Sequence, residues 1–157
     1  MTRPSAALQV VTAALGAAGL IETIHGSDDV EITGVTQDSR TVQPGNLFLA
    51  WSGSAWGAHD FVAQAAEMGA AAAVVERYVP EAGIPQVQVS DGRLAAALAA
   101  DAVLGSPWAG LFTIGVTGTN GKTTTASLTQ HLLGSRGASA AVGTLGLVQP
   151  DGSGGEG

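Results

Sequence analysis

The stretch GVTGTNGKTTT, residues 115–125, sets the architecture expected for the second half of the chain. The apolar run LFTIGVTG (111–118) leads into it and predicts a buried strand, and GTNG (118–121) predicts a tight glycine loop. The residues from Lys122 to Gly137 predict a helix. A strand that passes through a glycine loop directly into a helix is typical of a parallel α/β sheet whose loop binds an anion.

The loop has the chemistry of a phosphate site. The first turn of a helix has free N–H groups and the positive end of the helix dipole, and glycines let the backbone approach phosphate oxygens without a Cβ. Lys122 is the single lysine of the 157 residues and would reach the β and γ phosphates of ATP. The Thr123 hydroxyl would ligate Mg²⁺, and Thr124 would add a hydrogen bond. The predicted nucleotide-binding residues are Gly118, Thr119, Asn120, Gly121, Lys122, Thr123 and Thr124.

The loop departs from the usual phosphate-binding pattern at one position. The pattern G-x-x-x-x-G-K-[ST] requires a glycine six residues before the lysine, where this chain has Val116, and Gly115 comes one place too early. The alternative is a glycine turn before an amphipathic helix whose lysine is incidental. Every other basic residue of the chain is an arginine, which favours a dedicated role for Lys122.

The composition limits the classes of function. Of the 157 residues 45% are hydrophobic, enough for a core, and the formal charge is −7 with no basic patch, which excludes a nucleic-acid partner. The absence of cysteine excludes disulfides and thiolate metal sites and is consistent with a cytoplasmic protein. His25, His59 and His131 lie far apart and show no metal-ligand spacing.

The N-terminal segment predicts an amphipathic helix that begins near Ser5. Arg3 followed by an apolar run also resembles a signal peptide, but the three- and four-residue spacing of the apolar positions favours the helix. No run is long enough to span a membrane, so we expect no membrane partner. The predicted buried face consists of Leu8, Val11, Leu15 and Ala18, with Gln9 and Thr12 on other faces.

Strands and helices then alternate up to residue 104, which predicts an α/β domain. The predicted strands are residues 30–39, 46–51 after a Pro44-Gly45 turn, 70–76 and 85–90. One predicted helix follows Asp60, presents Phe61, Ala65 and Met68 on one face and ends at Gly69; the next is capped by Asp91 and carries Leu94 and Leu98.

The pattern breaks at GSPWAG, residues 105–110, which we interpret as a linker between an N-terminal domain (1–104) and the start of a second domain (111–148). The second stretch would contain a strand, the loop, a helix and a further strand over 139–146. Such a unit is too small for an independent core, so we expect the rest of a mostly parallel sheet to lie elsewhere in a larger protein. Residues 149–157 predict a flexible tail.

The loop GVTGTNGKTTT resembles the ATP site of the Mur ligases, the family that builds the peptide stem of peptidoglycan. TQDSRTVQPGNLFLAWSG (36–53) and HDFVAQAAEMGAAAAVVE (59–76) resemble the N-terminal segments of the same family. GTLG (143–146) is typical of the member that adds the third amino acid, diaminopimelate or lysine. The resemblance covers about residues 30–148 and rests on these segments together.

The resemblance implies a small N-terminal domain that holds UDP-N-acetylmuramoyl-L-Ala-D-Glu, followed by an ATPase domain with Mg²⁺. In the family's reaction the substrate carboxylate attacks the γ-phosphate of ATP, and the amine of the amino acid then displaces phosphate from the acyl phosphate. The resemblance therefore implies that the glycine loop binds ATP and that Lys122 and Thr123 are the catalytic pair. Departures from the family pattern occur at Gln37, where leucine is common, and in WGAHDF (56–61), which has Gly57 and Ala58 in place of aspartate and glycine. The UDP-precursor contacts implied by the resemblance are Gln37, Ser39, Ser54, Ala55 and Trp56.

Several alternatives stay open at this point. Asp38 and Arg40 could form only a local cap and ion pair, and Trp51 could pack in the core or support a nucleobase. The chain has no second lysine for the carbamylated lysine of the family, so we expect it to be an N-terminal piece of a ligase, inactive alone. The other hypotheses are a UDP-precursor binding module without catalysis and an unrelated phosphate-loop ATPase or kinase. Neither the diamino acid nor the oligomeric state can be inferred.

Overall fold

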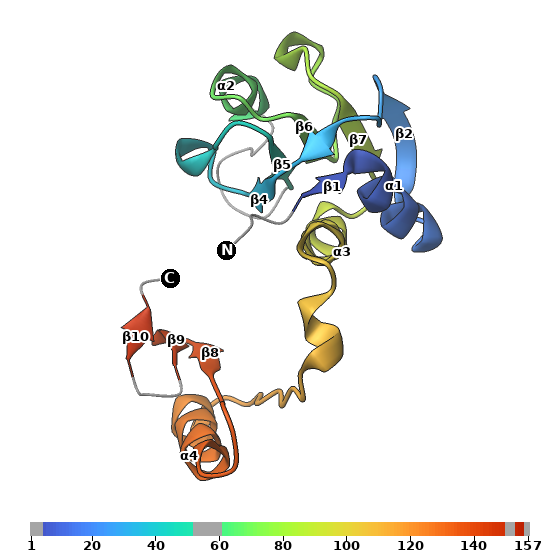
Figure 1. Cartoon of the computed structure of the whole chain (residues 1–157). Coiled ribbons are helices and arrows are strands. Elements are labelled where there is room, and N and C mark those ends of the chain that lie inside the picture. The colour runs from blue at the N-terminus through green and yellow to red at the C-terminus, as the bar shows by residue number, and fades with distance from the viewer. Residues whose placement is uncertain (1–4, 52–60, 150–152, 156–157) are drawn as a thin grey trace. The chain divides into compact units, whose positions relative to one another are not determined.

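The computed structural model describes residues 5–51, 61–149 and 153–155. The chain divides into two compact units, Met1–Leu111 (unit 1) and Phe112–Gly157 (unit 2), and each is described by itself (Figure 1). The helices of unit 1 are α1 (Leu8–Ala17), α2 (Val62–Glu67) and α3 (Gly92–Leu104). Its strands are β1 (Ala6–Ala7), β2 (Ile21–His25), β3 (Glu31–Ile32), β4 (Gly34–Thr36), β5 (Asn46–Ala50), β6 (Ala72–Val75) and β7 (Gln86–Val89).

Unit 1 is a three-layer α/β structure, which confirms the predicted fold class. Its main sheet has the order β2-β7-β6-β5-β4; β4 to β7 are parallel and β2 pairs antiparallel with β7. Figure 1 shows α2 on the opposite side of this sheet from α1 and α3. The cluster on the α1 and α3 side includes Leu8, Leu15 and Leu47, and the cluster on the α2 side includes Phe48 and Val62.

The central strands form because their sequences suit a sheet covered on both faces. Every residue of β5 (NLFLA) and β6 (AAVV) is buried, as expected for parallel strands with helices on both sides. The turn before β5 is also confirmed: Asn46 N donates to Gln43 O (3.0 Å), and Gly45 has a φ of 87°. Pro44 and Gly45 therefore take the two central positions that suit proline and glycine in a type II turn.

A buried glutamine ties β7 to the segment that precedes it. Gln86 is 1% exposed; its Nε2 donates to Val79 O (2.7 Å), and its Oε1 accepts from Val79 N (3.0 Å). The side-chain amide thus pairs with the backbone of Val79 as a neighbouring strand would. Burial of these polar groups is tolerated because each has a partner.

The N-terminal predictions need three corrections. The helix begins at Leu8, because Ala6–Ala7 pair with Glu31–Ile32 as β1 and β3. Thr12 is buried and Ala18 is exposed, the reverse of the prediction, and the Thr12 hydroxyl is satisfied by Gln9 O at 3.1 Å. The predicted strand 30–39 is two short strands in different sheets, and β2 was not predicted.

Two predicted helix faces are also partly wrong. On α2 the buried residues are Val62 and Ala65, whereas Phe61 and Met68 are each 39% exposed; Asp60 lies outside the described residues. On α3 the Asp91 cap is confirmed, since its Oδ1 accepts from Leu94 N at 2.9 Å. Leu94 itself is exposed, because the face against the sheet uses small residues that bring the helix close. These are Ala95, Ala99 and Val103.

Unit 2 contains the predicted helix, as α4 (Lys122–Gly134), and a small antiparallel sheet of β8 (Ala141–Gly143), β9 (Gly146–Val148) and β10 (Gly154–Gly155). The predicted strand 139–146 is confirmed only as the short strand β8, because the chain turns back after Gly143 to form a hairpin with β9. The tail is not wholly unstructured, since Gly154–Gly155 pair with Leu147–Val148.

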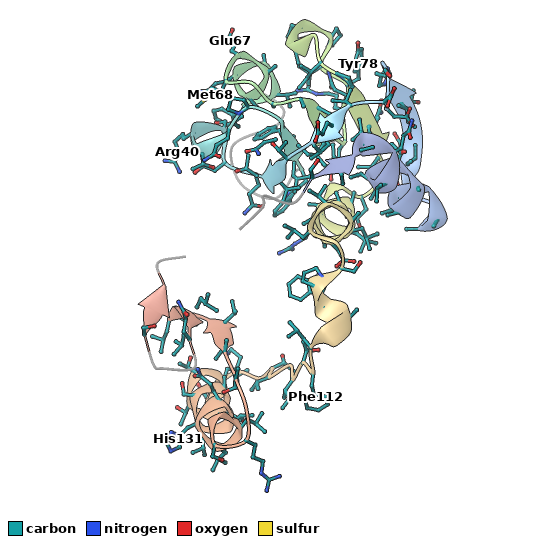
Figure 2. The ribbon with its side chains drawn as sticks, viewed as in Figure 1. Arg40, Glu67, Met68, Tyr78, Phe112 and His131 are labelled. Carbon is teal, nitrogen blue, oxygen red and sulfur yellow. The ribbon has the colours of Figure 1, made fainter. Side chains whose placement is uncertain are left out.

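The predicted buried strand 111–118 is wrong as well. These residues are in no strand, and among the described residues no β-strand pairs with them, so their backbone lacks the ladder that would make them part of a sheet. Phe112 is 88% exposed and projects from the ribbon in Figure 2. Within the described part of unit 2 no residue reaches the buried class.

One side chain holds the helix of unit 2 to its sheet. Gln130 Nε2 lies 3.1 Å from Val148 O, 3.0 Å from Gln149 O and 3.4 Å from Ser139 O, and Ser139 Oγ donates to Gln130 O at 3.0 Å. Since an amide NH₂ has two hydrogens, it satisfies two of these three carbonyls at a time. In the described ranges of the whole chain, no helix has the length and apolarity needed to cross a membrane.

Candidate functional site

The glycine loop of unit 2 ends in the first turn of α4. Gly121 is the N-cap residue with a φ of 76°, Gly118 has a φ of 143°, and Gly121 O accepts from Thr125 N at 2.9 Å. Both φ values lie in the region that favours glycine, so the two glycines are required for this backbone path. A Cβ at Gly121 would meet no atom within 4 Å, and a Cβ at Gly118 would meet only Asn120 O, at 3.7 Å, so glycine is required at both positions by the backbone angles and not by lack of space.

The Lys122 side chain folds back over the loop that precedes it. Its Nζ donates to Gly118 O at 2.6 Å, which places the ammonium group above the glycine bend. Among the described residues no carboxylate pairs with Lys122. The ammonium is therefore held by one loop carbonyl and remains available to an anion that enters the bend.

The surroundings of this loop suit a phosphate. Thr119, Asn120, Thr123 and Thr124 are exposed, and the first turn of α4 contains no acidic residue. The first turn of a helix also supplies free N–H groups and the positive end of the helix dipole, and Lys122 is the first residue of α4. The residues predicted for ATP are thus adjacent in the loop and the first turn of α4, and their chemistry fits a polyphosphate. The Thr123 hydroxyl is the group that would ligate Mg²⁺ there.

The carboxyl ends of β4 to β7 form a second candidate site, in unit 1. Ligands of open parallel sheets bind outside these ends. Gln37 and Ser39 follow β4; Gln37 is exposed and Ser39 is buried at 8% exposure in a 3₁₀ turn, Ser39–Thr41. Three further predicted contacts, Ser54, Ala55 and Trp56, lie outside the described residues.

An ion pair fixes the turn that holds Ser39. Asp38 Oδ1 accepts from Arg40 N (3.0 Å), and the Asp38 carboxylate also accepts from Arg40 Nε (2.9 Å) and NH2 (2.6 Å). These hydrogen bonds lower the pKa of Asp38 to about 2, and the largest contribution comes from the Arg40 side chain. The local cap and the ion pair between Asp38 and Arg40 are therefore both present, and Arg40 points outward in Figure 2. The consequence is a well-defined position for the Ser39 backbone between them.

Sequence reasoning did not identify a cluster at the ends of β5, β6 and β7. The Arg93 guanidinium carbon lies 5.4 Å from the centroid of the half-buried Trp51 ring. Glu76 Oε1 accepts from Gly92 N at 2.9 Å at the start of α3. The available signal was an arginine two residues after the helix cap Asp91, where a helix dipole disfavours positive charge.

Two parts of the chain match domains of a known family. Residues 31–104 match the Mur ligase family, catalytic domain, and residues 116–153 match the Mur ligase middle domain. Together the two matches cover more than two thirds of the chain.

The chain is 39% identical over 120 residues to the UDP-N-acetylmuramoyl-L-alanyl-D-glutamate–2,6-diaminopimelate ligase of Listeria monocytogenes. That match includes 76% of this chain and 24% of the relative, so the chain spans about a quarter of the length of the curated relatives that it matches.

Solved structures agree with this result. A UDP-N-acetylmuramoylalanyl-D-glutamyl-2,6-diaminopimelate–D-alanyl-D-alanyl ligase from Acinetobacter baumannii matches with a TM-score of 0.66 and 34% identity, over 88% of this chain and 30% of that one. The MurF ligase of Thermotoga maritima in complex with ADP matches with a TM-score of 0.54 and 30% identity, over 67% and 24%. With the glycine loop and the parallel sheet already described, these matches show that the chain belongs to the Mur ligase family.

Proposed function

We propose that this chain supplies the UDP-precursor domain and the beginning of the ATP site of a ligase that adds the third amino acid to UDP-N-acetylmuramoyl-L-Ala-D-Glu. The observation that carries the proposal is the Lys122 ammonium, which Gly118 O holds at the glycine bend where α4 begins. The name of the Listeria relative supports diaminopimelate as the amino acid. The boundaries that we propose are 1–104 for the precursor domain, 105–110 for the linker and 111–148 for the part of the ATPase domain, in a protein of the cytoplasm.

The physical problem of this reaction is charge. A carboxylate must approach a polyphosphate, and the chain itself has a formal charge of −7. The loop amides and the Lys122 ammonium would offset this repulsion and hold the γ-phosphate in line for attack. Mg²⁺, when bound through the Thr123 hydroxyl, would neutralise further charge. Thr124 and the backbone of residues 118–121 would fix the position of the phosphates.

In unit 1 the residues that would bind the precursor are Gln37 and Ser39, together with Ser54, Ala55 and Trp56. Ser39 is supported by its position in a rigid turn at the carboxyl end of β4. A second candidate function, a precursor-binding module without catalysis, is favoured by one observation: within the described ranges, all buried residues belong to unit 1.

Calorimetric titration with Mg-ATP tests the role of the loop. We expect weak binding by the 157-residue chain and loss of binding in Lys122→Ala. Ser127→Ala, an exposed change on the same helix beyond its first turn, is the matched control and should bind as the wild type does. Equal affinity in Lys122→Ala and wild type would refute the ATP site. Titration with the UDP precursor tests unit 1 separately, and a folded chain that does not bind it would refute the precursor assignment.

A further inference from the structure

At the carboxyl edge of the unit 1 sheet, one arginine has no carboxylate partner among the residues that the structure describes. Arg40 is engaged by Asp38, and Arg77 also takes part in an interaction. The interaction that the structure gives for Arg93 is with the face of the Trp51 ring. Among the described residues, none contributes a carboxylate to the exposed Arg93 guanidinium.

The position of Arg93 is not explained by the stability of its own helix. Arg93 is the second residue of α3, after the cap Asp91, and at a helix N-terminus a positive charge opposes the dipole. The two carboxylates beside it are used by the backbone: Asp91 accepts from Leu94 N, and Glu76 accepts from Gly92 N. Both carboxylates keep their negative charge and offset the positive charge of Arg93, but among the described residues neither forms an ion pair with its guanidinium. The guanidinium N–H groups of Arg93 are therefore left for a ligand.

The sheet register places Arg93 beside the predicted precursor site. Ala50 pairs with Val75, so Trp51 and Glu76 leave their strands side by side. Thr36 pairs with Phe48, so Ser39 and Trp51 each lie three residues beyond a paired position on adjacent strands. Ser39 and the Trp51–Arg93 contact therefore both lie beyond the carboxyl ends of adjacent strands, which are about 5 Å apart in a sheet.

Trp51 restricts the guanidinium that it supports. When an arginine lies over an indole ring, its guanidinium N–H groups stay free to donate in the guanidinium plane. The side chain is already restricted, so it loses less rotamer freedom when it binds a ligand. Diphosphate oxygens are the acceptors that such a fork binds with two parallel hydrogen bonds. A precursor with a UDP group has this diphosphate, and the net charge of the chain makes a local cation necessary to hold it.

We propose that Arg93 binds the diphosphate of the UDP precursor and that Trp51 is the positioning residue that orients its guanidinium. This inference rests on the precursor-binding function proposed for unit 1. It adds a phosphate contact that is separate from the implied contacts at Gln37, Ser39 and residues 54–56. Trp51 then acts through Arg93 and does not stack on the base.

The test is calorimetric titration of the 157-residue chain with the UDP precursor and UDP, with uridine binding followed by NMR as the phosphate-free control. Arg93→Gln should weaken precursor and UDP binding roughly ten- to hundredfold, the range of a lost charge-assisted pair, and leave uridine unchanged. Arg136→Gln removes the same charge from unit 2 and should change nothing. Thermal unfolding confirms that each variant is folded.

Two more variants separate positioning from packing. Trp51→Phe keeps an aromatic face, so its affinity for UDP should be close to that of the wild type. Trp51→Leu should have a severalfold lower affinity for UDP and an unchanged affinity for uridine. Loss of uridine binding in Trp51→Leu would instead make Trp51 a base shelf and overturn its positioning role. If wild type binds the precursor and Arg93→Gln binds it equally, the inference is wrong while the precursor function stands. If folded wild type binds neither precursor nor UDP, the precursor function fails and the inference fails with it.

Discussion

Replacing Gly92 with alanine tests how tightly α3 is joined to the carboxyl edge of the sheet. A Cβ at this buried position would lie 2.6 Å from Trp51 Cβ and 2.7 Å from Glu76 Oε1. Carbon atoms pack at about 3.5–4.0 Å, so either α3 or the end of β5 must move by about 1 Å. Rotation of the Trp51 side chain cannot relieve the contact, because its Cβ is attached directly to the backbone.

The expected cost follows from these contacts. Overpacking of this kind costs about 1–3 kcal/mol, and the carboxylate of Glu76 would also be pushed from Gly92 N–H, which adds about 1 kcal/mol. The better helix propensity of alanine recovers up to about 1 kcal/mol. We therefore expect Gly92→Ala to lower the free energy of unfolding of unit 1 by about 2 kcal/mol.

Urea denaturation followed by far-ultraviolet circular dichroism measures this change. Gly110→Ala is the matched control, because a Cβ at Gly110 would meet no atom within 4 Å. We expect its free energy of unfolding to lie within about 0.5 kcal/mol of that of the wild type. For a unit of this size, 2 kcal/mol corresponds to a melting point lower by about 10 °C. A Gly92→Ala midpoint equal to that of Gly110→Ala would refute the close packing of α3 against Trp51.

Three further perturbations have distinct expected outcomes. Phe48→Ala leaves a cavity at a fully buried position and should lower the free energy of unfolding, measured by urea denaturation, by about 3–5 kcal/mol. Phe112 is 88% exposed, so Phe112→Ala should change the free energy of unfolding of the 157-residue chain little. Similar losses in the two variants would contradict the assigned burial. Gln130→Ala should speed amide hydrogen exchange in β8 and β9 by roughly tenfold, because the backbone carbonyls that accept from the Gln130 amide lose their donor. Gln149→Ala is the control. Unchanged exchange in Gln130→Ala would show that the sheet does not depend on the Gln130 side chain. Folding lowers the pKa of Asp38 from its ordinary value near 4 to about 2, so the ionised carboxylate stabilises the fold fully above pH 4, and this stabilisation is lost as the pH falls through 2. The urea midpoints of wild type and Asp38→Asn should therefore differ at pH 6 and converge near pH 2. A difference that does not change with pH would contradict the ion pair.

The elements predicted best are those whose local chemistry and burial agree. β5 and β6 are continuous apolar runs, the Pro44-Gly45 turn has the residues that its dihedral angles require, and Asp91 caps α3 as an isolated helix would need. The glycine loop before α4 belongs to the same class, because Gly118 and Gly121 carry the positive φ values.

The failures occur where partners distant in sequence decide the structure. β2 is an antiparallel edge strand with exposed positions, and only its pairing with β7 defines it. The apolar run 111–118 has strand propensity, but in the described part of the chain no strand pairs with it. The contact between Arg93 and Trp51 joins residues 42 positions apart; the arginine at the helix start marks Arg93 as unusual, but no local pattern names Trp51 as its partner.

At position 86 the fold depends on the side-chain amide of Gln86, which both donates and accepts a hydrogen bond. The donor and the acceptor of this side chain each face the complementary group of Val79. Glutamate has almost the same shape, but it would set an oxygen against the Val79 carbonyl, and leucine would leave both backbone groups of Val79 without a partner in a dry environment. Here the most conservative replacement by volume is among the least acceptable, so this site selects for polarity and direction rather than for size.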